Sequence, residues 1–279
     1  MVFDYAFIAL FAAACLYPFL YIVGASFSSM RAVSSGEVIL WPVDFNIDAY
    51  TQLLADRQIF MAMRNTVLIA VVGTGLNMFA TILCAYALSK KRLDGRGVFT
   101  AIIVFTMMFS GGMIPNFLLI RSLRLMNTYW ALWLSGLQST YNMIVLRTFF
   151  QGIPDSLEES AQIDGASDPY ILFRIVLPLS GAALATITLF YAVGWWNAYF
   201  SPMLYISSSE KYPLMVKLRQ MLDTASNRNI RFDDGSNIEI AQETFRAASI
   251  LVATLPIICV YPFLQKYFVK GVMIGSLKG

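Results

Sequence analysis

Residues Ala182–Ile206 read AALATITLFYAVGWWNAYFSPMLYI, without a single charged side chain. A bilayer core about 30 Å thick is crossed by roughly 20 apolar residues in a helix, so this stretch is long enough to span a membrane. Five more stretches, the last two slightly shorter, have the same character: Tyr5–Phe27, Val67–Leu88, Phe99–Ile120, Tyr129–Leu146 and Ala248–Gln265. The sequence therefore predicts six membrane spans.

Composition agrees with this interpretation. Hydrophobic residues make up 58% of the 279 and charged residues only 13%, with a mean hydropathy of +0.63; soluble domains carry about 25% charged residues. Backbone groups in lipid must bond within their own segment, and the apolar runs do not alternate as in an outer-membrane barrel. We expect one all-α integral membrane domain over residues 1–279.

The residue inventory excludes several function classes. The chain has no histidine, which removes the commonest general base and metal ligand and every Ser-His or Cys-His nucleophile. Its three cysteines, Cys15, Cys84 and Cys259, lie in apolar runs without a CxxC pair, so neither a zinc site nor a disulfide framework is expected. The small net charge of +3 gives no indication of nucleic acid binding.

The N-terminal stretch has two interpretations. Asp4 precedes the apolar run, no Lys or Arg does, and the run continues to Phe27, which favours a first membrane span. The alternative is a cleaved signal, since Ala12-Ala13-Ala14-Cys15 faintly resembles a lipoprotein cleavage site.

Short loops predict the orientation. The segment Lys90-Lys91-Arg92-Leu93-Asp94-Gly95-Arg96 is strongly basic and should be cytoplasmic. Alternation then places both termini and the loop 150–181 in the cytoplasm, and the segments Ser28–Thr66 and Ser207–Ala247 outside. Either outer segment is a plain connection or a docking surface for an external partner. Within the second, Pro213 opens a helical pattern (Leu214, Leu218, Met221, Leu222), and the polar stretch Thr224–Asn237 follows.

The loop 150–181 contains helix start and stop signals. Ser156 followed by Glu159 has the spacing of a capping box, and Gly165 suits the end of a short helix. Asp168-Pro169 predicts the start of a second helix, and Pro178 lies before the fifth span. We expect a helix–turn–helix knuckle whose first helix is 156–164.

The same loop resembles the EAA loop of ABC importer permeases. The family form is Glu-Ala-Ala, three residues, Gly, nine residues, Ile, any residue, Leu-Pro; the corresponding residues here are Glu159-Ser160-Ala161, Gly165 and Ile175-Val176-Leu177-Pro178. Ser160 alone departs from it, as a small residue that preserves close packing. The flanking Asp164-Gly165-Ala166-Ser167 resembles the carbohydrate-importer branch. A plain amphipathic connector is the alternative.

The resemblance extends over nearly the whole chain. Phe109–Pro115, Gly194-Trp195-Trp196-Asn197 and Tyr261–Phe268 resemble permeases for oligosaccharides and polysaccharide fragments. The tail 269–279, with Gly271, Gly275 and Lys278, is similar to that of the maltose-type second permease subunit, which reaches into the ATPase dimer interface. A frayed end is the alternative for this tail.

The resemblance implies a type I importer permease in a bacterial cytoplasmic (inner) membrane. Its expected partners are a homologous second permease in a heterodimer, two ATP-binding subunits and an extracytoplasmic sugar-binding protein. The chain has no G-x-x-x-x-G-K-[ST] loop, so it holds no cofactor, and ATP and Mg²⁺ belong to the partner subunits. The resemblance gives the first helix of the knuckle the role of coupling helix, with Ser156, Glu159, Ser160, Ala161, Asp164, Gly165, Ile175 and Pro178 contacting or supporting the ATPase.

Polar and aromatic side chains at membrane depth are candidates for the sugar pathway. In a continuous helix, Tyr191, Trp195 and Tyr199 form one stripe with Asn197 nearby. Two further sets share a helix face: Gln138, Tyr141 and Asn142 in span four, and Thr74, Asn77 and Thr81 in span two. The alternative is that these residues hold helices together. Likewise, Gly111-Gly112 with Pro115 predicts an interruption of span three that either lines a cavity or is a packing kink.

Other functions remain as alternatives. An ABC permease for a non-sugar solute lies in the same class, and the tail and the Trp-Asn element disfavour it. A secondary transporter is expected to have an acidic residue within a span, and none of the six has one. A membrane-embedded enzyme is disfavoured, because the chain has no histidine and no clustered carboxylates within its predicted spans. The sequence does not name the sugar, although the branch resemblance suggests uronate oligomers such as alginate.

Overall fold

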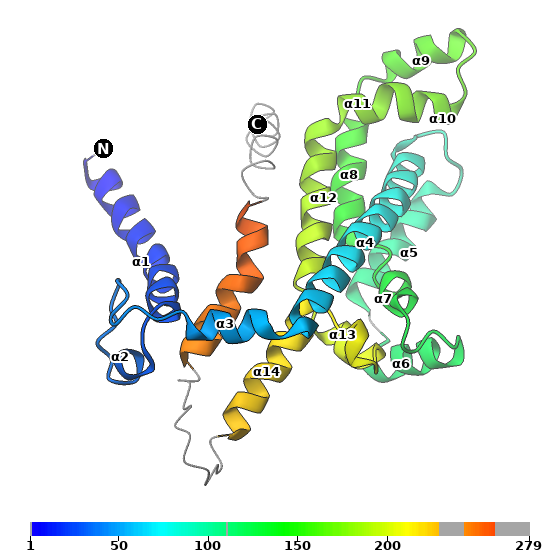
Figure 1. The fold of residues 1–279 in the computed structure, drawn as a ribbon. Helices are drawn as coiled ribbons and strands as arrows, with labels where there is room; N and C mark the ends of the chain where they lie inside the picture. Colours follow the sequence, from blue (N-terminus) through cyan, green and yellow to red (C-terminus); the bar gives the residue numbers. More distant parts are fainter. Residues whose placement is uncertain (1, 110, 229–242, 260–279) are drawn as a thin grey trace. The chain divides into compact units, whose positions relative to one another are not determined.

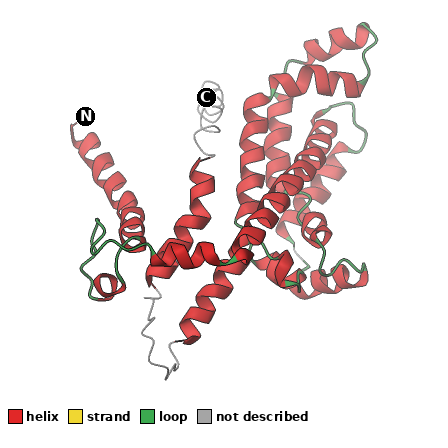
Figure 2. Ribbon diagram, viewed as in Figure 1, coloured by secondary structure: helices red, strands yellow, loops and turns green. Residues whose placement is uncertain are grey.

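The computed structural model describes residues 2–109, 111–228 and 243–259, and every regular element within these ranges is helical (Figures 1 and 2). The described residues form two units. The first comprises the described residues of Met1–Arg64 and Glu210–Cys259, and the second comprises the described residues of Asn65–Ser209. The expectation of an all-α chain is confirmed for this part of the sequence.

The first unit contains the N-terminal helix and the helices of the two predicted outer segments. These are α1 (Val2–Ser26), α2 (Met30–Ser34), α3 (Asp48–Ala55), the start of α4 (Arg57–Ser89), the 3₁₀ turn η2 (Ser209–Lys211, with its first residue in the second unit), α14 (Leu214–Arg228) and a helix over 243–259. Leu214 and Leu218 of α14 are buried with Leu53 of α3 and Ala248, so the helical pattern predicted after Pro213 is confirmed. The helix α14 also covers residues 224–228 of the predicted polar stretch.

The second unit contains the rest of α4 and the central helices. They are α5 (Arg96–Met108), α6 (Met113–Ser122), α7 (Tyr129–Ser135), α8 (Thr140–Gln151), α9 (Asp155–Ile163), α10 (Asp168–Ile171), the π-helical turn η1 (Leu172–Val176), α11 (Leu177–Leu179), α12 (Gly181–Trp196) and α13 (Phe200–Tyr205). Its core combines side chains of α4, α8, the α10–α11 region and α12: Ala85, Leu146, Phe150, Ile171, Val176 and Ile187.

Two helices of the described residues, Phe3–Ser26 and Arg57–Ser89, are long and apolar enough to cross a membrane, and up to four spans result if each of two bent helix pairs counts as one. One pair is α5 with α6, bent by 112°, which confirms the interruption predicted at Gly111-Gly112. The other joins Asp168–Leu179 to α12, with a bend of 86°.

Two predicted spans are wrong as continuous helices. Span four is divided between α7 and α8 because Gly136 follows the last turn of α7 and the Ser139 hydroxyl caps α8 by accepting from the Asn142 N–H. Span five is divided at Asn197, between α12 and α13. Pro202 has no N–H for the carbonyl of residue 198, so one helix cannot run through this region with its bonds intact. Of span six, the structure describes the part up to residue 259.

Candidate functional site

The first helix of the knuckle, α9, begins one residue earlier than predicted. Pro154 occupies the N-cap position without a side-chain cap bond, and Asp155 is the first helical residue. The predicted capping box at Ser156 and Glu159 is therefore wrong, since Ser156 lies inside the helix. Asp155 and Glu158 supply negative charge to the first turn instead, where it complements the positive end of the helix dipole.

The end of α9 is as predicted. Gly165 has φ +83, a left-handed conformation that favours glycine. The N–H of Gly165 donates to the carbonyl of Gln162 at 3.0 Å, and the N–H of Ala166 donates to the carbonyl of Ala161 at 2.9 Å. This pair of bonds is a Schellman motif, and it closes the helix.

The second helix of the knuckle contains a feature that the sequence analysis missed. Ser167, one residue before the predicted Asp168, occupies the N-cap position of α10 without a side-chain cap bond. The chain then passes through η1 and α11. Pro178 lacks an N–H for the carbonyl four residues earlier, and Leu177 donates to the carbonyl of Leu172 in the wider π pattern. At the 86° bend into α12, the buried Ser180 hydroxyl donates to the Val176 carbonyl at 2.7 Å.

The residues assigned to ATPase coupling divide between two faces. Ala161 and Ile175 pack against the core of the second unit. The others are exposed: Ser156, Glu159, Ser160, Asp164, Gly165 and Pro178. The sequence analysis did not single out Leu157 and Ile163, whose side chains are 43% and 86% exposed on α9. The geometry of α9 is that of a short capped helix with one supported and one open face.

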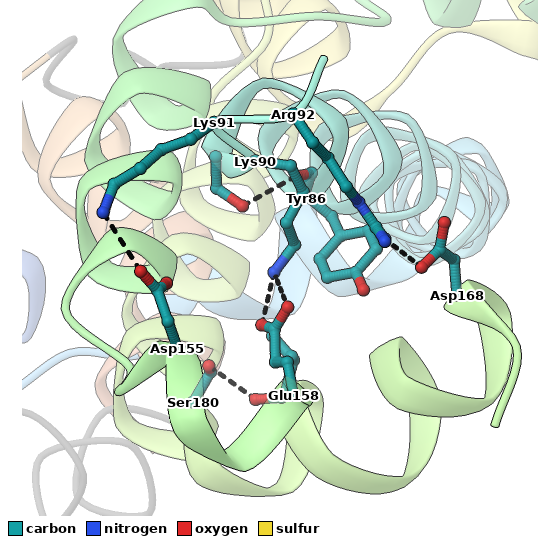
Figure 3. A network of polar contacts seen from close by, with 10 residues as sticks. Tyr86, Lys90, Lys91, Arg92, Asp155, Glu158, Asp168 and Ser180 are labelled. Carbon is teal, nitrogen blue, oxygen red and sulfur yellow. Dashed lines mark hydrogen bonds and ion pairs between the residues drawn. The ribbon is translucent and has the colours of Figure 1, made fainter. Parts of the chain in front are cut away.

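Acidic residues of the knuckle pair with the basic loop that follows α4 (Figure 3). Lys90 forms an ion pair with Glu158, and Arg92 forms one with Asp168. In the third pair, Lys91 Nζ lies 3.0 Å from Asp155 Oδ2. We call Lys90–Glu158 the inner pair and the other two the outer pairs. These contacts hold the basic loop against the knuckle.

The inner pair differs from the outer pairs in burial. The Lys90 and Glu158 side chains are only 16% and 12% exposed, whereas those of Lys91 and Asp155 are 83% and 71% exposed. Lys90 Nζ also lies 4.3 Å from the ring centroid of Tyr86 on α4, a cation–π distance. Sequence reasoning used Lys90 only as an orientation signal and overlooked Glu158. The available signal was the run of three basic residues after α4 together with the acidic residues of the loop 150–181.

A second polar cluster, which we call the hub, surrounds Asn77 of α4. Asn77 is 1% exposed, and its Nδ2 donates to the carbonyls of Gly136 at 2.5 Å and Leu137 at 2.7 Å. Its Oδ1 accepts from Trp195 Nε1 of α12 at 2.6 Å. One amide side chain thus pairs with two backbone carbonyls at the break between α7 and α8. Such carbonyls need a hydrogen-bond partner in apolar surroundings.

Tyr191 completes the hub. Its hydroxyl lies 2.7 Å from Thr81 Oγ1 of α4 and accepts the N–H of Ser139 at 3.2 Å. A Cβ at Gly73 would lie 2.6 Å from the Trp195 ring, and one at Gly136 would lie 3.0 Å from it. Glycine at these two positions therefore permits the close approach of Trp195 to α4 and to the α7–α8 break.

The structure separates the sugar-pathway candidates. Tyr191, Trp195, Asn77 and Thr81 are engaged in the hub, which is the helix-holding alternative. Tyr199 lies beyond α12, so the predicted stripe ends at Trp195 and is wrong in its last member. Gln138 borders the hub, since its Oε1 accepts from Thr81 Oγ1 at 3.5 Å. The candidates differ in their exposure. Gln138 and Tyr141 are exposed, Asn142 is 6% exposed, the exposed Asn197 donates to the Val193 carbonyl at 3.0 Å, and the Thr74 hydroxyl is buried without a partner.

Two further expectations concern the tail and metals. Gly271, Gly275 and Lys278 of the C-terminal tail lie outside the described residues. Among the residues that the structure describes, no group of three His, Cys, Asp or Glu side chains could hold a metal ion.

Several known proteins are similar to this chain. Residues 77–274 match the family described as "Binding-protein-dependent transport system inner membrane component". The chain is 45% identical to the polygalacturonan/rhamnogalacturonan transport system permease protein YtcP of Bacillus subtilis, over 99% of this chain and 96% of that protein. It is 38% identical, with a TM-score of 0.86, to a chain of a bacterial ABC transporter involved in the import of the acidic polysaccharide alginate, over 96% and 95% of the two chains. A bacterial alginate ABC transporter in complex with an alginate pentasaccharide-bound periplasmic protein shares the fold, with a TM-score of 0.57 at 14% identity over 94% and 93% of the chains.

Proposed function

The chain belongs to the family of binding-protein-dependent transport system inner membrane components, and from this premise we propose that it is a permease subunit that carries fragments of an acidic polysaccharide into the cytoplasm. The observation that supports this function best is the knuckle, with a short helix held on one face by the core and open on the other. Such an element suits the transfer of motion from a separate ATPase.

The coupling surface in this proposal is the open face of α9. Glu159 and Ser160 contact the ATP-binding subunit, and the exposed Ile163 and Leu157 provide apolar area beside them. Ala161 and Ile175 pack against the core and transmit the motion of α9 to it. Gly165 fixes the turn that orients α9, through the bonds described above. Pro178 and Ser180 form the joint to α12.

Topology and partners complete the proposal. Six spans cross the cytoplasmic membrane, with both termini, the basic loop and the knuckle inside; the ion pairs support a common side for the last two. A second permease, two ATP-binding subunits and an extracytoplasmic sugar-binding protein form the working complex. The ATPase partners bind ATP and Mg²⁺. ATP binding moves α9 and opens the core helices outward to receive the sugar, and hydrolysis returns them.

The substrate class comes from the relatives. One is named for polygalacturonan, a polymer of a uronic acid, and another for alginate, described as an acidic polysaccharide. Carboxylate-bearing oligosaccharides are common to both. Within this chain, the exposed Gln138, Tyr141 and Asn197 and the half-buried Tyr199 remain available as neutral hydrogen-bonding and stacking groups.

The experiment measures ATP hydrolysis and oligogalacturonate uptake together in proteoliposomes that contain the full complex. A variant with both Glu159→Gln and Gly165→Ala is expected to keep ATP hydrolysis within about threefold and to lower uptake at least tenfold. Asp94→Asn is the matched control, because it removes one negative charge from an exposed position outside the knuckle. Wild-type uptake in the double variant would refute the coupling role, and wild-type complex that imports only neutral oligosaccharides would refute the acidic substrate.

A further inference from the structure

The inner pair and the hub lie on the same helix. Lys90 directly follows α4, and Asn77 lies within it, in the part of the helix that belongs to the second unit. At 1.5 Å per residue, the two residues are roughly 20 Å apart along the helix axis. The helix α4 is continuous over Arg57–Ser89, without proline and without a π turn, so it connects the two sites as one rigid element.

The knuckle has two connections to the membrane helices. The covalent one runs through η1, Pro178 and the 86° bend at Ser180 into α12. Its helical hydrogen bonds change pattern twice within a few residues, which is typical of a joint. The other connection runs from α9 through Glu158 to Lys90, at the end of an uninterrupted helix. A displacement of α9 is therefore passed on with less bending through the second connection.

At its other end, α4 holds the hub. Asn77 bonds the carbonyls of the α7–α8 break and the Trp195 indole, and Thr81 bonds Tyr191. A shift of α4 must move or break these contacts, because a carbonyl at a helix break in apolar surroundings needs a replacement for Asn77. The exposed Gln138 lies within the same break, so the accessibility of this position reports on the state of the hub.

We propose that the inner pair makes α4 a transmission lever, which carries the motion of the knuckle to the hub and thereby sets the conformation of the α7–α8 break. This proposal rests on the proposed function, since it assumes that α9 receives motion from an ATPase. It assigns Lys90 and Glu158 as positioning residues for transport, although neither belongs to the EAA motif. The outer pairs have no part in it, because exposed ion pairs hold two elements only weakly.

The test uses charge reversal in the complete complex. The variants are Lys90→Glu, Glu158→Lys and the exchange of both, with Lys91→Gln as the control that removes the neighbouring exposed pair. In proteoliposomes, each single reversal is expected to retain the ATPase partners and their hydrolysis within about threefold, while uptake per ATP falls at least tenfold. The exchange is expected to restore uptake to within about threefold of wild type, and Lys91→Gln to change it less than twofold.

A conformational measurement separates transmission from a purely structural role. With the native cysteines replaced, Gln138→Cys is labelled by a maleimide before and after addition of a non-hydrolysable ATP analogue. The labelling rate is expected to change with nucleotide in the parent and in the exchange variant, but not in Lys90→Glu, although that complex still binds nucleotide.

Three results would overturn the proposal. They are single reversals that keep wild-type uptake per ATP, single reversals that fail to assemble while the exchange assembles, and a nucleotide-dependent labelling change that survives in Lys90→Glu. The proposed function would stand in each case if the Glu159 and Gly165 variant still uncouples uptake from hydrolysis. If that variant imports normally, the fault lies in the proposed function itself.

Discussion

The knuckle contact and the hub lie at two places along α4 and differ in their chemistry. Where the basic loop meets the knuckle, three ion pairs of unequal burial form the contact, two with α9 and one with α10. Around Asn77, the contact consists of neutral hydrogen bonds and of glycines that let an indole approach. Charges suit the first region because its outer pairs are exposed, whereas neutral groups in the hub avoid the cost of a charge in apolar surroundings. The difference indicates that the hub should be the less tolerant of substitution.

The largest effect is expected at the centre of the hub. Asn77→Leu leaves two backbone carbonyls and the Trp195 indole N–H without a partner, at a cost of about 3 kcal/mol in the free energy of unfolding. Denaturant titration of the purified permease in mixed micelles measures this. Thr74→Val is the matched control on α4, because the buried Thr74 hydroxyl has no partner to lose. Equal stability of the two variants would contradict the assigned role of Asn77.

The second-largest effect on stability is expected from a steric clash in the hub. Gly73→Ala places a Cβ 2.6 Å from the Trp195 ring, and we expect a loss of roughly 1–3 kcal/mol in stability with a change in Trp fluorescence. Gly75→Ala has open space around its Cβ and should be neutral or stabilising by up to about 1 kcal/mol. If Gly75→Ala proves the more damaging, the close approach of Trp195 to α4 is wrong.

The turn after α9 gives a smaller, local effect. Gly165→Ala puts a Cβ on a residue with φ +83, at a cost of about 1–2 kcal/mol. Hydrogen exchange of the α9 amides should quicken by roughly one order of magnitude, while amides of α4 stay protected. Gly181→Ala has space for its Cβ and no positive φ, and it should leave exchange in α9 as in wild type. Uniform exchange changes along the chain would argue against a local turn.

The smallest effect is expected at an outer pair. Arg92→Gln removes an ion pair whose side chains are 51% and 55% exposed, so the loss should be below about 1 kcal/mol and should vanish at high salt. Stability measured at two ionic strengths tests this. A large, salt-independent loss would remove the distinction between outer and inner pairs.

The sequence was most informative where local chemistry determines the structure. Apolar length predicted the long helices α1 and α4, Gly165 predicted the end of α9, and Pro213 predicted the start of α14. The two helix breaks were missed because Gly136 and Pro202 lie within uncharged apolar runs, and the length of such a run does not show where a helix is interrupted. The ion pairs and the hub join residues far apart in the chain, such as Asn77 and Trp195, and local patterns do not specify such partners.

The most direct test of the account asks what the open face of α9 touches. A photo-crosslinker at Ile163, whose side chain is 86% exposed, is activated in the assembled complex. The account predicts a covalent adduct with an ATP-binding subunit, and protection of this position from membrane-impermeant reagents added outside. An absence of any adduct with that subunit, together with labelling from the outside, would contradict it.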